Sequence, residues 1–273
     1  MLVPYQPNRF LKAVFAVLLF SAVLHADNFP TICPAPNIGK PPLFPSATAT
    51  PIDLLCGLGG SPGPEAPQNT AKNNFCALGA AGPITIQQMV DLQTSVQSNK
   101  AISFGNPDKH PLSARPGPAT NRAPLEVLGE GKPVVLQGFV LEAAQEGEES
   151  VNCGKTPPDQ PVYHDIHISI VNSPGNKDGC SGIVAEMIPH HRPATWTAAA
   201  VQAVANAHLM VRVTGQLMFD SSHTPCVSGA AIAGDPKRVS LWEVHPVYKF
   251  EVCPSGKCAT AGWVDLANWL PKR

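Results

Sequence analysis

The sequence predicts a mainly β protein, with an OB-like five-stranded barrel behind an irregular, Pro-rich, disulfide-containing N-terminal segment. Five strand-like segments in the second half of the chain follow the order three strands, one helix, two strands, which is the order of the OB-fold. Gly138 and Gly215 interrupt the first and fourth of these strands, where the bent strands of a small barrel need glycine. The alternative is an unrelated small barrel or sandwich with a helical crossover.

Each barrel element has its own local signal. The first strand is an apolar run, and the second alternates sharply, with Ile166, Ile168 and Ile170 on one face. The Ala-rich stretch after Pro193 has the composition of a helix. We expect strands at 134–143, 163–171, 182–188, 209–220 and 239–253, and a helix at 195–207.

The chain divides into four parts, with a signal peptide at 1–26 and an irregular Pro/Gly-rich segment at 27–124. The OB-like barrel follows at 125–258, and a C-terminal tail occupies 259–273. Within the irregular part a short helix is expected near 85–97, capped by Thr85. In the tail, Trp263 and Trp269 are expected to pack a short terminal helix against the barrel.

The first residues have the pattern of a secretory signal peptide. Arg9 and Lys12 precede an apolar run at 13–24, and Ala26 offers a cleavage site. A membrane anchor is the alternative, but a spanning helix needs about 20 apolar residues. We therefore expect a secreted or periplasmic protein with no membrane span after cleavage.

Export changes how the eight cysteines are interpreted, because an even number in an oxidising compartment predicts disulfides. Three pairings suggest themselves from position, namely Cys253 with Cys258, Cys153 with Cys180, and Cys56 with Cys76. None of the spacings makes a CxxC pair, which argues against a cysteine zinc site. The disulfide candidates are Cys33, Cys56, Cys76, Cys153, Cys180, Cys226, Cys253 and Cys258.

The composition excludes some classes of function. The net charge is −1, and aromatic residues are 6% of the chain, so there is no strong signal for nucleic acid and little for a long stacking platform. No GxSxG, P-loop or GxGxxG motif is present. The partner expected is a small molecule, a glycan or another protein.

Polar residues occupy one face of several expected strands. If these faces point outward, His167, Glu186 and His245 converge, and two histidines with one carboxylate are a ligand set for zinc or iron. A divalent metal is therefore a possible cofactor, with Asp165 or Glu243 as the catalytic base that activates a bound water. Two further ligand candidates, Asp220 and His223, border the same surface. The alternative is a structural role, with these side chains solvated or hydrogen-bonded across strands.

Four segments carry a resemblance to a known family. The segments DIHISIV (165–171), VAEMIP (184–189), RVTGQLMFDSSH (212–223) and SLWEVHPV (240–247) resemble a family of exported bacterial proteins with an OB-like barrel. The resemblance covers residues 133–253 best. It implies the fold and a joint role for the polar positions, and it implies no particular activity.

The leading hypothesis from the sequence is an exported ligand-binding or interaction module. One alternative is a metal-dependent hydrolase with a His/carboxylate site on the barrel face. A third is a structural envelope-associated protein tethered by its Pro-rich front.

Overall fold

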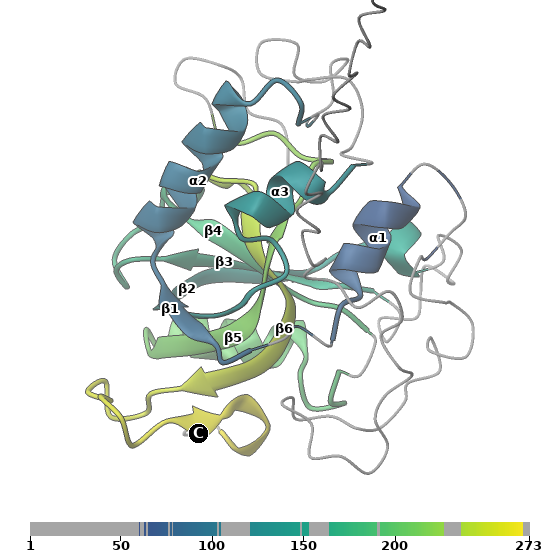
Figure 1. Ribbon diagram of the computed structural model, residues 1–273. Coiled ribbons are helices and arrows are strands. Elements are labelled where there is room, and N and C mark those ends of the chain that lie inside the picture. The colour runs from purple at the N-terminus through teal and green to yellow at the C-terminus, as the bar shows by residue number, and fades with distance from the viewer. Residues whose placement is uncertain are drawn as a thin grey trace, which may run out of the picture.

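The computed structural model describes residues 60, 63, 65–75, 77, 79–102, 104, 121–147, 149–152, 164–189, 192–226 and 236–269 (Figure 1). The expected signal peptide and four of the eight cysteines, Cys33, Cys56, Cys76 and Cys153, lie outside these residues. In the part of the chain that is described, no helix is both long and apolar enough to cross a membrane.

Five strands close into a barrel at the centre of the molecule (Figure 1). The neighbour order is β2-β3-β4-β6-β5, and β5 pairs again with β2. All neighbours are antiparallel except β4 and β6, which run parallel. The OB-like fold is thereby confirmed. Its elements are β2 (Pro133–Gln145), β3 (Ile166–Val171), β4 (Ile183–Met187), α4 (Ala198–Asn206), β5 (Met210–Phe219) and β6 (Trp242–Val252).

Shorter elements surround the barrel. β1 adds to it in parallel with β2, and β7 pairs antiparallel with β6. Helices α1, α2 and α3 all precede the barrel in sequence. The bounds are α1 (Ala66–Lys72), β1 (Gly82–Ile84), α2 (Ile86–Ser98), α3 (Ala123–Leu128), η2 (Ser150–Asn152), η4 (Gly179–Ser181), β7 (Val264–Asp265) and η5 (Leu266–Asn268).

The core fills the barrel with the apolar faces of its strands, as the alternation predicted. Ile166, Ile168 and Ile170 of β3 are all buried in it, and Val201 and Val204 bring α4 against the same cluster. Each fully buried aliphatic side chain stabilises the fold by about 1.5–3 kcal/mol relative to exposure. Because inward positions are taken by these residues, the alternate positions of β3, β4 and β6 point out of the barrel.

Two glycines permit close approach between strands. A Cβ on Gly215 would stand 2.4 Å from the Pro246 carbonyl oxygen, and one on Gly138 would stand 2.8 Å from that of Val171. The pairing of β5 with β6 shifts register on both sides of Gly215. The irregularity expected at this glycine is therefore present, and the nearby Pro246 carbonyl oxygen leaves no room for a side chain there.

The Pro-rich front contributes helices that pack on the barrel. α2 begins where expected, because the Thr85 side chain accepts from the Gln88 N–H in a capping box. Its Gln93 side chain accepts a 2.9 Å hydrogen bond from the Leu241 N–H at the start of β6. α1 was not expected, since Ala66–Lys72 shows no apolar periodicity.

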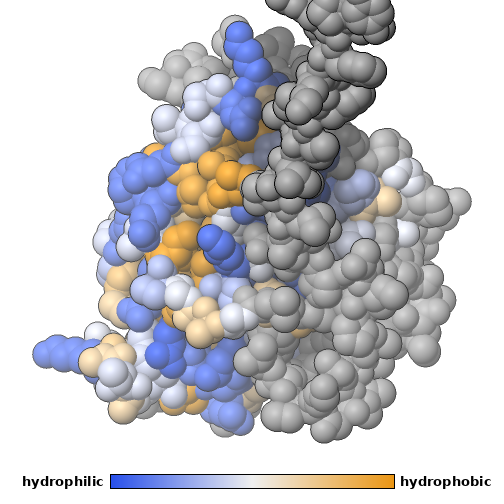
Figure 2. Space-filling model, in the orientation of Figure 1, coloured by the Kyte–Doolittle hydropathy of each residue, from blue (hydrophilic) through white to orange (hydrophobic). Residues whose placement is uncertain are grey.

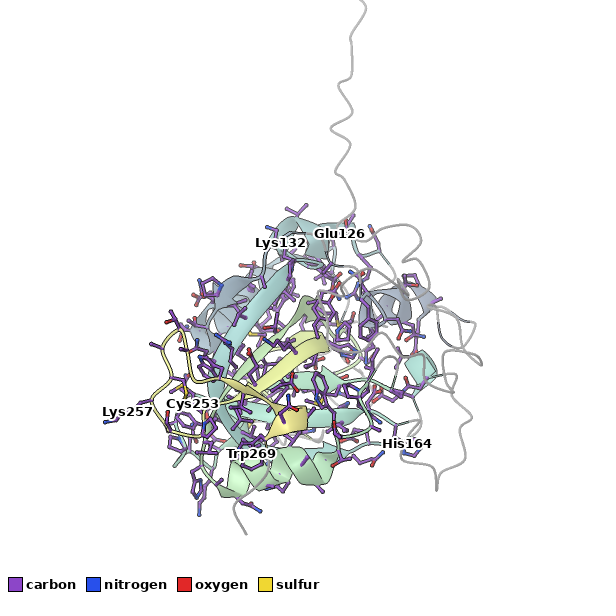
Figure 3. All side chains as sticks on the ribbon, turned by 90° about the horizontal axis from the view of Figure 1, so that it is seen from below. Glu126, Lys132, His164, Cys253, Lys257 and Trp269 are labelled. Atoms are coloured by element: carbon purple, nitrogen blue, oxygen red, sulfur yellow. A yellow bond between two sulfur atoms is a disulfide. The ribbon has the colours of Figure 1, made fainter. Side chains whose placement is uncertain are left out.

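The C-terminal tail differs from the short helix that the two tryptophans suggested. It forms the two-residue strand β7 and a single 3₁₀ turn, η5. Trp269 packs against the core, and the Trp263 ring lies 4.7 Å from the Arg212 guanidinium. Figure 3 shows Trp269 and Cys253 near this end, while His164 lies on the other side of the molecule in that view.

All four described cysteines form disulfides. The predicted pair Cys253–Cys258 is confirmed. The pairing of Cys180 with Cys153 is wrong, because Cys180 bonds to Cys226 and so ties η4 to the loop after β5. Cys153 is nearer to Cys180 in the sequence and was therefore the expected partner. Closure of the barrel instead brings Cys226, 46 positions away, next to Cys180.

Candidate metal centre

The polar face of β3, β4 and β6 lies outside the barrel but is not exposed. His167 is 4% exposed, and Glu186, Glu243 and His245 are 0% exposed. His167 pairs directly with Glu186 across β3 and β4, and the parallel pairing of Ala185 with Val244 sets β6 beside β4. A second layer, made by α1 and the η2 segment, must therefore cover these side chains.

Side-chain hydrogen bonds hold α1 on the barrel wall. The Gln68 amide donates to Asp220 at 3.1 Å and accepts from the Ser221 N–H at 3.0 Å, both at the end of β5. Gln216 of β5 donates to the Ala71 carbonyl oxygen at 2.7 Å and to that of His245 at 2.9 Å. α1 is thereby fixed directly over the polar face.

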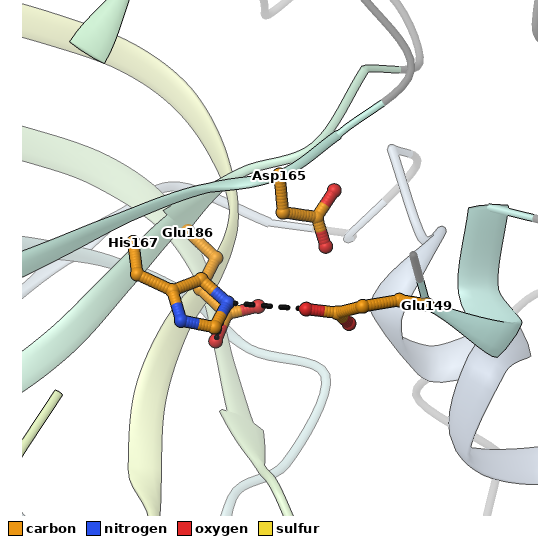
Figure 4. A group of neighbouring side chains, drawn as sticks. All are labelled: Glu149, Asp165, His167 and Glu186. Carbon is orange, nitrogen blue, oxygen red and sulfur yellow. Dashed lines mark ion pairs between the residues drawn. The ribbon is translucent and has the colours of Figure 1, made fainter. Parts of the chain in front are cut away.

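Four side chains from three parts of the chain converge under this cover (Figure 4). Glu149, Asp165, His167 and Glu186 each offer a donor atom, and these atoms all lie within 4.8 Å of one another. His167 Nε2 lies 3.1 Å from Glu186 Oε1 and 3.3 Å from Glu149 Oε1. The Asn152 amide donates to Asp165 Oδ1 at 2.8 Å, and Oδ2 has no hydrogen-bond partner among the described residues.

These short contacts are ion pairs when His167 is protonated, and His167 Nδ1 also lies 3.3 Å from Glu146 Oε1. Among the described residues, neither ring nitrogen of His167, neither oxygen of Glu186, nor Oδ2 of Asp165 has a hydrogen-bond partner. Buried polar atoms are normally hydrogen-bonded, so a group of five such atoms without a hydrogen-bond partner needs an explanation. Two ligands bonded to one cation at about 2.1 Å stand about 3.0–3.4 Å apart, depending on whether the geometry is octahedral or tetrahedral. The observed separations match that spacing.

A second donor set shares Glu186 with the first. The donor atoms of Glu186, Glu243 and His245 also lie within 4.8 Å of one another. His245 Nδ1 is 2.7 Å from Glu186 Oε2 and 3.4 Å from Glu243 Oε2. The Arg238 guanidinium binds the other Glu243 oxygen, Oε1. Glu186 therefore faces one histidine with each of its oxygens.

A buried lysine stands beside both sets. Lys72 Nζ lies 2.9 Å from Asp220 Oδ2, 3.5 Å from Glu149 Oε2 and 4.0 Å from Glu186 Oε2. Burial acts to lower the pKa of Lys72, but the carboxylates, Asp220 foremost, outweigh it and raise the pKa well above its usual value. Lys72 is therefore a fixed ammonium in this site.

The same carboxylates raise the pKa values of His167 and His245. Burial opposes their charged forms, but Glu186 and its neighbours raise the pKa of His167 well above its usual value and that of His245 to about 9. Burial raises the pKa of Asp165 and of Glu243 to about 7, assisted by the nearby carboxylates. The carboxylates thus create a strong preference for positive charge next to both imidazoles.

The residues expected from the sequence do lie together. His167, Glu186 and His245 share one face, with Asp165 and Glu243 beside them, although the two histidines belong to different donor sets. Asp220 lies at the border against Lys72. His223 sits further out, with Nε2 3.5 Å from Asp220 Oδ2, and burial together with Arg238 lowers its pKa to about 4.

The sequence did not predict several contributors to the site, among them Lys72, Glu149 and Arg238. Lys72 lies on the unexpected helix α1, Glu149 on the loop before η2, and Arg238 on the loop before β6. None shows a periodic signal, because each reaches the site through the packing of distant segments. Lys72 stands out only once the structure shows that this charged residue of α1 is buried.

A surface groove lies apart from this cluster. It runs between α2 and the β1–β2 edge and is lined by residues such as Ile84, Leu92 and Val134. Figure 2 shows hydrophobic side chains gathered beside α2 on this face. None of the donor residues lines the groove.

No protein-family model matches the chain, and no curated protein or solved structure shows significant similarity to it. The family resemblance of the four segments stays a prediction, and a function must be argued from the geometry.

Proposed function

We propose that this protein binds a divalent cation on the outer face of its barrel, through Glu149, Asp165, His167 and Glu186. One observation carries the proposal. Four donors from three parts of the chain converge within 4.8 Å, and several of their atoms lack hydrogen-bond partners among the described residues. A cation accounts for both facts, since it needs lone pairs aimed at a common point and no hydrogen between them.

The donor set indicates which cations fit. Three carboxylates and one imidazole make a mixed oxygen and nitrogen set, which suits Mn²⁺, Fe²⁺ and Zn²⁺. Asn152 and Lys72 supply the outer contacts that orient such ligands, on Asp165 and Glu149 respectively. This makes the ligand-binding module expected from the sequence a metal-binding one.

The test is metal analysis of the full chain, purified without a His-tag and then loaded with Mn²⁺. We expect at least one equivalent to be retained after gel filtration, and a 10–100-fold or larger loss of affinity in Glu186→Gln and in Asp165→Asn. Glu142→Gln, which removes an exposed carboxylate from β2, is the matched control and should bind as the parent does. Retention below about a tenth of an equivalent by a folded parent protein would refute the proposal.

A second candidate function is metal-dependent hydrolysis. It is favoured by the fixed ammonium of Lys72, which is 3.5 Å from the donor Glu149 and suited to stabilise negative charge in a transition state. A divalent cation lowers the pKa of a bound water, whose oxygen bonds to the carbonyl carbon or phosphorus while the leaving group departs with a proton. If these four side chains held a six-coordinate ion, two positions would remain for water and substrate.

Hydrolysis is tested separately from binding. Chromogenic phosphate and carboxylate esters should be cleaved by the Mn²⁺-loaded chain. Lys72→Met should lower kcat by about 10²-fold or more, the scale seen when one oxyanion-stabilising donor is removed. Turnover no faster than the metal-containing buffer would reject this second candidate and leave metal binding intact.

Export is the third part of the proposal. Two disulfides are typical of oxidising compartments, and the first residues have a signal-peptide pattern. Expression of the full chain in a bacterium with a periplasm should yield a secreted or periplasmic product that begins at Asp27. A cytoplasmic product that keeps residues 1–26 would contradict it.

A further inference from the structure

We infer that the centre is dinuclear. A second divalent cation of the same class would be held by Glu186, Glu243 and His245, with the Glu186 carboxylate bridging the two ions. This inference rests on the proposed first site. It gives a role to Glu243 and His245, which the first site does not use.

The position of Glu186 is the first argument. Its Oε1 faces His167 Nε2 at 3.1 Å, and its Oε2 faces His245 Nδ1 at 2.7 Å. The side chain is 0% exposed, and neither oxygen has a hydrogen-bond partner among the described residues. A carboxylate that bridges two cations gives one oxygen to each, and two-metal sites space their ions about 3.5–4 Å apart. Glu186 has the arrangement of such a bridge.

The remaining donors of the second site are fixed in place. His245 and Glu243 project from the same face of β6, beside Glu186 on β4. Arg238 binds Oε1 of Glu243 and orients the carboxylate, so that Oε2 points to His245 Nδ1 at 3.4 Å. An outer-shell arginine of this kind restricts a ligand to one orientation.

Two cationic side chains lie near this second set, and neither occupies its donor atoms. Arg238 is bound to Oε1 of Glu243, not to Oε2. Lys72 is 2.9 Å from Asp220 Oδ2 but 4.0 Å from Glu186 Oε2. The ammonium and the guanidinium are thus held chiefly by other oxygens, and Oε2 of Glu186 and Oε2 of Glu243 both face His245 Nδ1.

The number of buried acids also fits two cations. Glu149, Asp165, Glu186, Asp220 and Glu243 all lie in the cluster, and the four strand-borne or strand-end acids among them are 0% exposed. Lys72 pairs with Asp220 and Arg238 with Glu243, which leaves Glu149, Asp165 and Glu186. Buried carboxylates without a counter-ion are costly, and one divalent cation would balance only two of these three charges. Two ions at bridging distance bind two oxygens of one oxyanion, which makes a phosphate ester the class of ligand that would span them.

The test combines Mn²⁺ stoichiometry with low-temperature electron paramagnetic resonance on the full chain. We expect two equivalents and an exchange-coupled spectrum. In His245→Ala we expect one equivalent and the six-line spectrum of isolated Mn²⁺. Glu243→Gln provides a second variant if His245→Ala does not fold, and His208→Asn, an exposed position with φ of 51°, is the control that should behave as the parent.

The outcomes separate the two proposals. One equivalent with an uncoupled spectrum in the parent protein overturns the dinuclear centre and keeps the first site. No bound Mn²⁺ overturns both proposals. Two equivalents retained by His245→Ala, or two uncoupled ions in the parent, place the second ion elsewhere and also overturn this inference.

Discussion

Replacing Lys72 by methionine tests whether the buried cluster is organised by charge. Methionine keeps most of the apolar stem and removes only the ammonium. Lys72 is 5% exposed, and its Nζ lies 2.9 Å from a carboxylate that is 0% exposed. The variant therefore isolates the contribution of one buried positive charge among several negative ones.

The magnitude follows from the distances. At an effective dielectric constant of about 20, two unit charges separated by 2.9 Å attract by about 6 kcal/mol. The cost of burying the ammonium offsets part of this attraction, and removal of one partner of a buried pair destabilises by about 3–5 kcal/mol. We expect Lys72→Met to lower the free energy of unfolding of the metal-free protein by that amount.

Metal should reverse part of the loss. A ligand that binds only the folded state stabilises it by about 2.7 kcal/mol at 100 times its dissociation constant. Because a divalent cation supplies the positive charge that the methionine side chain lacks, saturating Mn²⁺ should stabilise the Lys72→Met variant at least as much as the parent.

Urea denaturation with the disulfides intact measures both effects, provided the m-value is unchanged. Lys100→Met, which removes an exposed lysine just beyond α2, is the control and should change stability by less than about 0.5 kcal/mol. A Lys72→Met protein as stable as the parent without metal would show that protons already neutralise the carboxylates, and would refute the charge argument.

Three further predictions concern the fold. Gly215→Ala should lower the free energy of unfolding by about 1–3 kcal/mol, since its Cβ would meet the Pro246 oxygen at 2.4 Å, whereas Gly175→Ala, with nothing within 4 Å, should have little effect in the same urea assay. Serine replacement of both cysteines should cost about 4 kcal/mol at Cys180–Cys226 and about 2 kcal/mol at Cys253–Cys258, because the closed loops differ in length (separations of 46 and 5), and equal losses would contradict this loop-length argument. Burial acts to raise the pKa of Glu251, but hydrogen bonds from Arg212 and Lys249 outweigh it and lower the pKa, so Glu251 contributes stability above its unfolded pKa that is lost as the pH falls through the folded value. Glu251→Gln should therefore be less stable than the parent at pH 7 by less than about 1 kcal/mol. Thermal unfolding should show this difference shrinking as the pH falls below about 4.3, the unfolded pKa, and vanishing below the lower folded pKa; a difference that grows in acid would contradict this pairing.

The barrel could be predicted because its signals are local. A strand repeats every two residues, so the alternation at 165–171 fixed which side chains enter the core and which face outward. The same reasoning put His167, Glu186 and His245 on one face, and the strand order of the OB-fold brought the three strands together. The Thr85 cap was equally visible, because the capping box spans only four residues.

The cover over that face could not be predicted from local pattern. α1 is short, and its place is set by hydrogen bonds to β5 that join residues more than 140 positions apart. Lys72 and Glu149 meet across 77 positions, and Cys180 finds Cys226 across 46. The barrel and the polar face of its strands can be derived from the residues alone, since both follow from the two-residue repeat. The burial of this face is a tertiary property, because α1 and the η2 segment carry no periodic signal and are positioned by contacts with distant residues. That burial turns a row of polar strand residues into a closed cluster of metal-ligand spacing.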